Sequence, residues 1–209
     1  MSNQFNKIVV LDLEATCWDD NGTKAEFYRK SEIIEIGICE IDVTKGIIDN
    51  KRSIYVKPIM EYNQTLSDFC VDLTGITVDT LEKRGKYLPD AIAELRKHYP
   101  TSKTWGSWGG FDLTLLKKNC EEFRERVKSF DSINVDVSKY DMNDLFPFNE
   151  SMYINFKNLY GLMRKMKRSP GMKKALELEN LTLDGKHHSG KDDAANTAKI
   201  VQKLLFNKE

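Results

Sequence analysis

The sequence lacks the features that mark several large classes of protein. No stretch of its 209 residues approaches the roughly 20 consecutive apolar residues of a membrane-spanning helix. Residues Met1 to Lys7 are polar, so we expect no signal peptide. The five prolines are scattered, and no internal repeat or Pro/Gly/Ser-rich linker is present. We therefore expect a single domain over residues 1–209 that makes no contact with a membrane.

Cysteine pairs and excess charge are also missing. The four cysteines stand far apart without a CxxC pair, which makes a zinc ribbon or a disulfide framework a poor interpretation. Reduced thiols are typical of a cytoplasmic protein. Lys+Arg and Asp+Glu both number 32, and this balance argues against a protein that coats nucleic acid by bulk charge. It is compatible with an enzyme that holds nucleic acid through bound metal ions.

The apolar pattern predicts an α/β fold. Residues 8–13 are almost wholly apolar, as expected of a central strand buried on both faces. Two further strands are predicted with a turn at 44–46 between them, which indicates an antiparallel pair. Helices then alternate with a strand, so we expect a mixed sheet, a three-strand antiparallel meander plus parallel strands, flanked by α-helices. The predicted strands are 8–13, 33–43, 53–57 and 104–108, and the predicted helices are 66–73, one opening at 89, 111–123 and 193–206; no element is assigned to 139–153.

Asp12 and Glu14 lie at the end of the predicted central strand. Side chains two residues apart on a strand share one face, so both carboxylates point the same way. The carboxyl end of such a strand is where open α/β sheets bind ligands. A lone Asp-x-Glu pair is also compatible with a solvated strand end, and further acids are needed to choose between the two.

Two other segments supply acids. Asp112 opens a predicted helix, where a simple N-cap is an adequate explanation. His187 and His188 each precede an acid by five positions, Asp192 and Asp193 respectively. Helical phase places Asp193 on the apolar stripe of the predicted helix. Asp192 falls on the water-facing stripe with residues 196, 199 and 203, and we interpret it as the helix cap. A carboxylate on an apolar stripe needs a partner, and a divalent cation is suitable.

Together these segments predict a metal centre for phosphodiester hydrolysis. Oxygen ligands without thiolates suit Mg²⁺ or Mn²⁺ better than zinc. Two such ions that share carboxylates activate water on one side of the phosphorus and stabilise the leaving oxygen on the other. A histidine whose pKa lies near neutrality can take the proton from that water.

These motifs resemble those of the DEDDh 3'→5' exonucleases, which have a ribonuclease H-like fold. The segments 11–17, 111–112 and 188–193 resemble the three family motifs in order. The segments 69–76, 171–176 and 187–194 resemble a subgroup in particular, the histone-mRNA and small-RNA 3' exoribonucleases and the bacterial sporulation-inhibitor exonucleases. The likeness extends from about Ile8 to Leu205. We expect no appended RNA-binding domain, which argues against a stem-loop-specific role.

The resemblance implies a role for each matching residue. Asp12, Glu14 and Asp193 would bind the catalytic ion, Asp12 and Asp112 would hold the second, and His188 would be the general base. The backbone after the first motif and nearby apolar side chains would hold the 3'-terminal nucleotide. The matching positions are Ala15, Thr16, Trp18, Leu73 and Phe111. Trp18 is equally compatible with a half-buried surface aromatic.

The predicted function is therefore removal of nucleoside 5'-monophosphates from the 3' end of nucleic acid, with RNA favoured and a monomer expected. One alternative is a DNA exonuclease of the proofreading or repair type, since the choice depends on contacts to the terminal 2'-OH. An alternative of another class is a non-catalytic nucleic-acid-binding module. An intact His188 beside four acids argues against that module, because a structural ion site needs no base.

Three weaker signals remain. Residues 164–168, with Lys173 and Lys174, are the densest basic run, and they form either a solvated face or a track for a single strand. Glu35 lies inside an apolar strand, where it is either structural or placed behind the metal ligands. Cys17 has no adjacent base on its segment, so we interpret it as a small buried residue.

Overall fold

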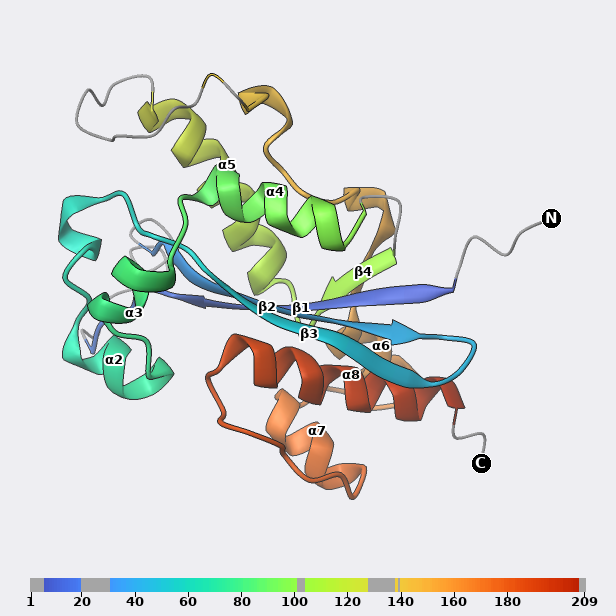
Figure 1. Cartoon of the computed structure of the whole chain (residues 1–209). Coiled ribbons are helices and arrows are strands. Elements are labelled where there is room, and N and C mark those ends of the chain that lie inside the picture. The colour runs from blue at the N-terminus through green and yellow to red at the C-terminus, as the bar shows by residue number, and fades with distance from the viewer. Residues whose placement is uncertain (1–5, 20–30, 101–103, 128–137, 139, 207–209) are drawn as a thin grey trace.

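A five-stranded sheet lies between two layers of helices in the computed structural model of the chain (Figure 1). The structure describes residues 6–19, 31–100, 104–127, 138 and 140–206, so most of the polar N-terminal segment, Met1 to Phe5, lies outside them. The elements are β1 (Lys7–Ala15), β2 (Ile33–Asp42), β3 (Ile47–Tyr55), α2 (Asp68–Thr74), α3 (Val78–Arg84), α4 (Leu88–His98), β4 (Thr104–Ser107), α5 (Phe111–Val127), β5 (Tyr153–Asn155), α6 (Phe156–Met163), α7 (Met172–Leu178) and α8 (Gly190–Phe206), with short 3₁₀ turns at Glu61–Asn63, Met142–Asp144 and Glu150–Met152.

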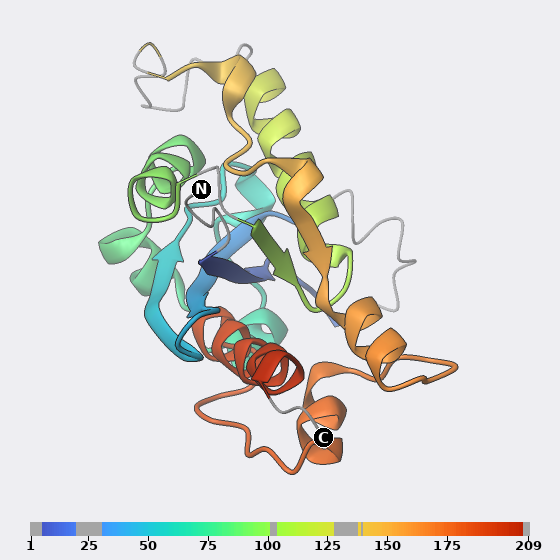
Figure 2. The same ribbon diagram turned by 90° about the vertical axis from the view of Figure 1, so that its right-hand side faces the viewer.

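The sheet has the mixed topology that the sequence predicts. Its strand order is β3-β2-β1-β4-β5. β1 pairs with β2, and β2 with β3, in antiparallel fashion, whereas β4 runs parallel to both β1 and β5. Helices α4 and α5 cover one face, and α8 covers the other with α6 and α7 beside it (Figures 1 and 2). The central position of β1 explains its apolar sequence, because both of its faces are buried.

Alternation along β1 sorts its side chains between the two cores. Val9, Leu11 and Leu13 pack in the core that contains the α4 and α5 side chains. Ile8 and Val10 pack instead against the apolar stripe of α8. The next side chains in that second row belong to residues 12 and 14, so strand geometry alone aims both acids at the α8 side of the sheet.

Several predicted boundaries need correction. The strand predicted at 53–57 runs from Ile47 to Tyr55; it lies at the sheet edge, and its alternately exposed polar residues conceal it from a search for apolar runs. The last helix begins at Gly190 and not at Asp193, since a backbone can enter a helix before its apolar stripe starts. The unassigned segment 139–153 contains 3₁₀ turns and the first residue of β5. The helix predicted at 66–73 is confirmed as α2, which Ser67 caps through a 3.1 Å bond from the Cys70 N–H.

None of the helices in the described ranges combines the length and the apolar character that crossing a bilayer requires.

The closest approach of α8 to the sheet generates a stability prediction at Gly37 of β2. An added Cβ there would lie 1.7 Å from the backbone carbonyl carbon of Gly190, so α8 has to move. We expect Gly37→Ala to lower the free energy of unfolding by about 2–4 kcal/mol. The corresponding fall in Tm is roughly 5–15 °C, which thermal or urea unfolding measures.

Gly171→Ala is the matched control, because no heavy atom lies within 4 Å of the added methyl group. As an N-cap change it should cost less than about 1 kcal/mol. Equal, small losses in the two variants would contradict the close backbone contact between β2 and α8.

Candidate active site

The candidate site starts from the two acids at the end of β1. Asp12 pairs in register with Gly37 of β2, and Glu14 pairs with Glu35. Asp12 is half-buried and Glu14 is buried. Both side chains lie on the sheet face that α8 covers, as the alternation of β1 requires.

Helix α8 supplies the third acid. Asp193 lies in its first turn and is only 4% exposed, which confirms its predicted inward orientation. One carboxylate oxygen each from Asp12, Glu14 and Asp193 lies within 4.8 Å of the other two. Gly190 allows this approach, because a Cβ added there would lie only 3.1 Å from the Asp12 carbonyl oxygen and from the Gly37 nitrogen. Gly37 and Gly190 face each other, and because both lack a side chain the backbones of β2 and α8 can approach closely.

Glu35 fixes the start of that helix. Its buried carboxylate accepts bonds from the backbone N–H groups of Gly190, at 3.0 Å, and Lys191, at 3.4 Å. It also accepts a 2.5 Å bond from the Ser53 hydroxyl of β3. A carboxylate at a helix N-terminus satisfies amide groups that have no partner within the helix and opposes the positive end of its dipole. Glu35 thus holds the start of α8 in place, which is the structural role; its placement behind metal ligands stays a prediction.

Asp112 arrives from the opposite side of the sheet. It lies in the first turn of α5, is buried, and accepts a 3.0 Å bond from the Leu13 N–H. That bond ties α5 to β1 between the two acids of the strand. The role of Asp112 therefore exceeds that of an N-cap, although its carboxylate is not among the three oxygens that lie closest together.

Concentrated negative charge disturbs the titration of these acids. Burial, followed by the nearby Asp112 carboxylate, raises the pKa of Asp12 well above its usual value. Burial, with Asp193 and Glu35 close by, raises the pKa of Glu14 to about 8. Burial also raises the pKa of Asp112 to about 6, against the bonds from Leu13 and Ser107 that favour its charged form. Without a cation, the ionised cluster is therefore disfavoured.

Both histidines of the third motif lie beside Asp193. The Nδ1 atom of His187 is 2.9 Å from Asp193 Oδ2, and the same oxygen accepts a 2.9 Å bond from the backbone N–H of His188. The two imidazole rings stack, with centroids 4.0 Å apart. His188 has a φ of +66°, a conformation that residues other than glycine seldom adopt and that often marks functional positions. Burial lowers the pKa of His188, which favours its neutral, proton-accepting form.

These residues fit a divalent cation. Asp193 Oδ1 is buried and has no hydrogen-bond partner among the described residues, and an ion beside Asp12 and Glu14 satisfies it. The three carboxylates are hard oxygen ligands of the type that Mg²⁺ and Mn²⁺ prefer. The raised carboxyl pKa values fit such a site, because a positive ion would stabilise the ionised form of each acid.

The predicted nucleotide-binding residues surround the end of β1. Ala15 and Thr16 are buried, and Thr16 is fixed by a backbone bond of 2.8 Å to the Glu32 carbonyl. Trp18 is half-buried, with its ring centroid 6.4 Å from that of Tyr62. Leu73 of α2 packs against the cluster that contains Cys17, and Phe111 opens α5. These positions are compatible with the predicted nucleotide contacts, which stay a prediction.

Two predictions about the third motif are wrong. Asp192 does not cap α8; its carboxylate accepts a 3.0 Å bond from the Lys186 N–H in the preceding loop. Asn196 does not face water; it is fully buried and exchanges two hydrogen bonds with the backbone of Asp184. The loop before α8 folds back over that face of the helix, and helical phase alone contains no information about such a cover.

Sequence reasoning misses the roles of Gly37 and His187. Gly37 lies in an otherwise apolar buried strand, and a glycine there signals a close backbone approach. The five-residue spacing pairs Asp193 with His188, yet the ring of His187 is the one that bonds to Asp193. Adjacent histidines have no spacing rule that separates their roles.

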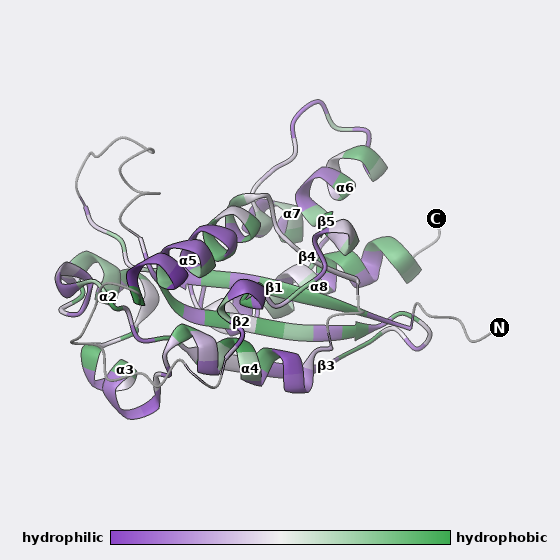
Figure 3. Ribbon diagram, turned by 90° about the horizontal axis from the view of Figure 1, so that it is seen from above, coloured by the Kyte–Doolittle hydropathy of each residue, from purple (hydrophilic) through white to green (hydrophobic). Residues whose placement is uncertain are grey.

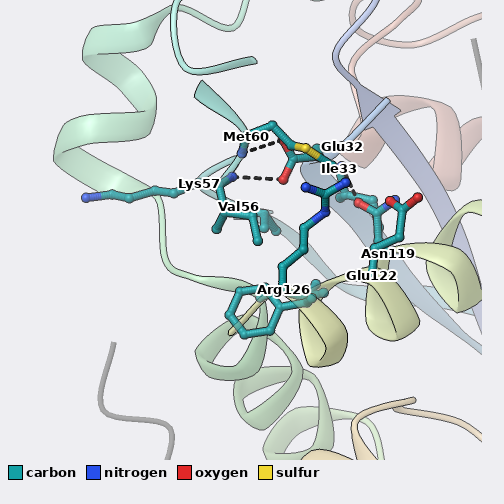
Figure 4. Close-up of a pocket in the computed structure, with 11 residues that line it drawn as sticks. Glu32, Ile33, Val56, Lys57, Met60, Asn119, Glu122 and Arg126 are labelled. Carbon is teal, nitrogen blue, oxygen red and sulfur yellow. Dashed lines mark hydrogen bonds between the residues drawn. The ribbon is translucent and has the colours of Figure 1, made fainter. Parts of the chain in front are cut away.

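A separate pocket lies between β2, the segment after β3, and α5 (Figure 4). Its buried carboxylate, Glu32, accepts bonds from the N–H groups of Ile59, at 2.8 Å, and Met60, at 3.0 Å. Asn119 of α5 accepts a 2.8 Å bond from the Ile33 N–H in the same view. These polar groups hold the fold together, so we place the candidate active site at the acid cluster.

The chain is similar to several known proteins. Residues 9–201 match the family model described as Exonuclease (RNase_T). The chain is similar to 3'-5' exoribonuclease 1 of Rattus norvegicus, with 30% identity over 217 residues that cover 98% of this chain and 54% of the relative. It is also similar to the 3'-5' exonuclease eri1 of Schizosaccharomyces pombe, with 28% identity over 94% of this chain and 67% of that protein. The chain thus spans about half the length of the mammalian relative.

A solved structure shows the same arrangement of elements. The nuclease domain of 3'hExo, described as a DEDDh family member bound to rAMP, superposes with a TM-score of 0.74 at 26% identity. The match covers 98% of this chain and 94% of that domain.

The raised carboxyl pKa values generate a prediction for the metal-free protein. A group whose pKa is higher when folded binds more protons in the folded state, so the free energy of unfolding falls as pH rises from about 4.5 to about 8. We expect Glu14→Gln to remove much of that fall, so that its Tm in EDTA exceeds the wild-type value by roughly 5–15 °C at pH 8 and by little at pH 5.

Added Mn²⁺ should stabilise the wild type more at pH 8 than at pH 5.5, because protons compete with the ion for the same oxygens. Glu14→Gln should show much less of this stabilisation. A wild-type Tm in EDTA that follows the variant at every pH would contradict the proposed cluster of ionised acids.

Proposed function

Because the chain belongs to the Exonuclease (RNase_T) family, we propose that it is a metal-dependent 3'→5' exonuclease that releases nucleoside 5'-monophosphates from RNA. Its fold is the ribonuclease H-like α/β fold that the resemblance implies. The observation that carries the proposal is the cluster of Asp12, Glu14 and Asp193 beside a histidine pair, in which one carboxylate oxygen of each acid lies within 4.8 Å of the other two. DNA is the second candidate substrate; the names of the relatives as exoribonucleases favour RNA.

The acids divide between two ions in this proposal. Asp12, Glu14 and Asp193 would hold one Mg²⁺ or Mn²⁺, and Asp12 with Asp112 would hold the second. When bound, such ions supply Lewis-acid activation of water and stabilisation of the leaving oxygen. The four carboxylates would place the ions, and the ions would supply the positive charge that a phosphate needs beside so many acids.

His188 is the residue that accepts the proton of the attacking water at a ring nitrogen. Its lowered pKa keeps that nitrogen free to accept a proton at neutral pH. His187 is a weaker candidate, since its Nδ1 atom is already 2.9 Å from Asp193 Oδ2. We assign His187 a positioning role, in which it orients Asp193.

The 3'-terminal nucleotide lies at the end of β1 in this proposal. The backbone of Ala15 and Thr16 binds its sugar, and Trp18, Leu73 and Phe111 contact its base. Thr16 is rigidly held by Glu32, so the backbone groups next to it are preorganised for a ligand.

We further propose a single exonuclease domain over 1–209 that acts as a monomer in the cytoplasm. All four cysteines are buried free thiols, which is typical of a reducing compartment.

The direct test uses two otherwise identical 5'-labelled single strands, one RNA and one DNA. Each is incubated with Mg²⁺, Mn²⁺ or EDTA, and the products are resolved by length. We expect shortening from the 3' end only with metal, and faster on RNA than on DNA. Asp12→Asn should lose at least about 10³-fold in rate, because it removes the one acid that both ions share.

Intact strands in every wild-type lane would contradict the proposed exonuclease activity. Binding of the intact strands, measured in a gel shift, would then support the alternative of a non-catalytic binding module. Equal shortening by the wild type and by Asp12→Asn would assign the cleavage to a contaminant.

A second test separates the two histidines. His188→Ala should lower kcat by roughly 10²–10⁴-fold, the usual contribution of a general base, with metal binding largely retained. His187→Asn should keep far more activity, and its main effect should be a higher metal concentration for half-maximal rate. An unchanged rate in His188→Ala together with an inactive His187→Asn would reverse the assignment of the base.

A further inference from the structure

The basic residues of this neutral chain are unevenly distributed. Residues 157–174 contain seven Lys and Arg residues and no acid, although Lys+Arg and Asp+Glu balance at 32 each over the whole chain. The segment covers most of α6, the following loop and the start of α7. A local excess of this size attracts polyanions even when the net charge is zero.

Most of these cations are not used to hold the fold. Arg164 forms a two-pronged ion pair with the buried Glu179, at 2.8 and 2.9 Å, and Lys174 pairs with Glu177 at 2.9 Å. Lys165, Lys167 and Arg168 are exposed and form no ion pair with any acid in the part of the chain that the structure describes. Their charges are therefore available to a ligand.

The loop that carries them is fixed in position. The Trp108 indole N–H donates to the Pro170 carbonyl at 3.2 Å, and the Met166 N–H donates to the Gly161 carbonyl at 2.8 Å. Gly161 packs closely against Ser169, since an added Cβ would lie 2.0 Å from the serine Oγ. The cations are thus presented by an ordered backbone, which lowers the entropic cost of binding.

The same contacts connect the loop to the acid cluster. Trp108 and Gly109 belong to the short segment that joins β4 to α5, and α5 begins with Phe111 and Asp112. The Lys157 side chain of α6 lies next to Gly109, about 4 Å from the position of a Cβ there. Basic groups therefore continue from the vicinity of the candidate site, past Trp108, to the loop.

Exposed apolar side chains are interleaved with the cations. Leu162 is 77% exposed, Met163 43% and Met166 36%. Green and purple segments alternate along α6 and the loop, which projects from the body of the molecule (Figures 2 and 3). A single strand of nucleic acid presents both phosphates and base faces, so a surface on which cations and apolar side chains alternate suits it.

We propose that the surface made by Lys157, Leu162, Met163, Lys165, Lys167 and Arg168, the basic surface, binds the single-stranded RNA that precedes the 3' end under attack. The inference rests on the proposed exonuclease function, because it assigns the basic surface to the same substrate. Its consequence is that long strands bind more tightly than a mononucleotide ester, which occupies the acid cluster alone.

The test variant is Lys165→Gln/Lys167→Gln/Arg168→Gln. Its affinity for a labelled 20-nucleotide single-stranded RNA is measured by fluorescence anisotropy in EDTA, so that no cleavage occurs. We expect affinity to fall at least tenfold at low salt. The log–log slope of affinity against salt should fall by about 2, or roughly 0.7 for each phosphate that the variant no longer neutralises. The turnover of a nitrophenyl ester of a nucleoside 5'-monophosphate with Mn²⁺ should change by less than twofold.

The matched control is Lys45→Gln/Lys51→Gln/Lys97→Gln, which removes the same charge from exposed positions on the β2–β3 hairpin and the end of α4. It should leave RNA affinity within twofold of the wild type. Equal losses in both triple variants would overturn the proposal, because only bulk charge would then matter. Unchanged RNA affinity in the test variant would overturn it as well.

Two further outcomes separate the possible failures. Polyglutamate that binds the wild type as tightly as RNA does, and does not bind the test variant, would assign the basic surface to an acidic protein. A wild type that binds RNA through this surface but hydrolyses neither RNA nor the ester would overturn the proposed function and not the RNA contact.

The apolar part of the basic surface has its own test. Leu162→Ser/Met163→Ser should weaken binding of normal RNA but not of a strand without bases.

Discussion

The mutual repulsion of carboxylates gathered at one point is the constraint on which the structure depends. Asp12, Glu14, Asp112 and Asp193 converge at the end of β1, with Glu35 directly behind them. Bringing ionised acids together in a buried site opposes folding, and the raised pKa values of Asp12, Glu14 and Asp112 express that cost. The apolar cores on both faces of the sheet have to offset it, and a bound cation relieves it.

The position of α8 decides whether the acids form a site at all. Asp193 reaches Asp12 and Glu14 because two glycines, Gly37 and Gly190, let the helix backbone touch the sheet. Glu35 then binds the free amide groups at the helix start, so an acid that adds to the repulsion also fixes the geometry. The active-site arrangement is therefore set by contacts between backbones, and those contacts leave little room for variation in the helix position.

The parts of the site that are predictable from the sequence are those that periodicity controls. Alternation along β1 places Asp12 and Glu14 on one face, and helical phase turns Asp193 inward, both as the structure has them. Helical phase gives the wrong prediction for Asn196, which the loop before α8 buries. It is also wrong for Asp192, whose carboxylate accepts a hydrogen bond from that loop. The start of β3 is missed because the first half of this edge strand alternates between exposed and half-buried residues. Contacts between segments distant in sequence, such as Glu35 with Gly190, follow from tertiary packing and have no local signature.

The neutral net charge conceals a separation of charge that the proposed reaction needs. Acids are concentrated at the end of β1, where we propose that cations and the scissile phosphate bind. Residues 157–174 contain seven Lys and Arg residues and no acid. A polyanion is repelled by the metal-free acid cluster, so its approach is favoured by bound cations and also by attraction elsewhere on the surface. A basic surface displaced from the acids supplies that attraction without pairing with them, whereas lysines placed inside the cluster would compete with the ions for the same oxygens. The distribution of charge, and not its sum, is thus the property that suits this chain to a nucleic acid substrate.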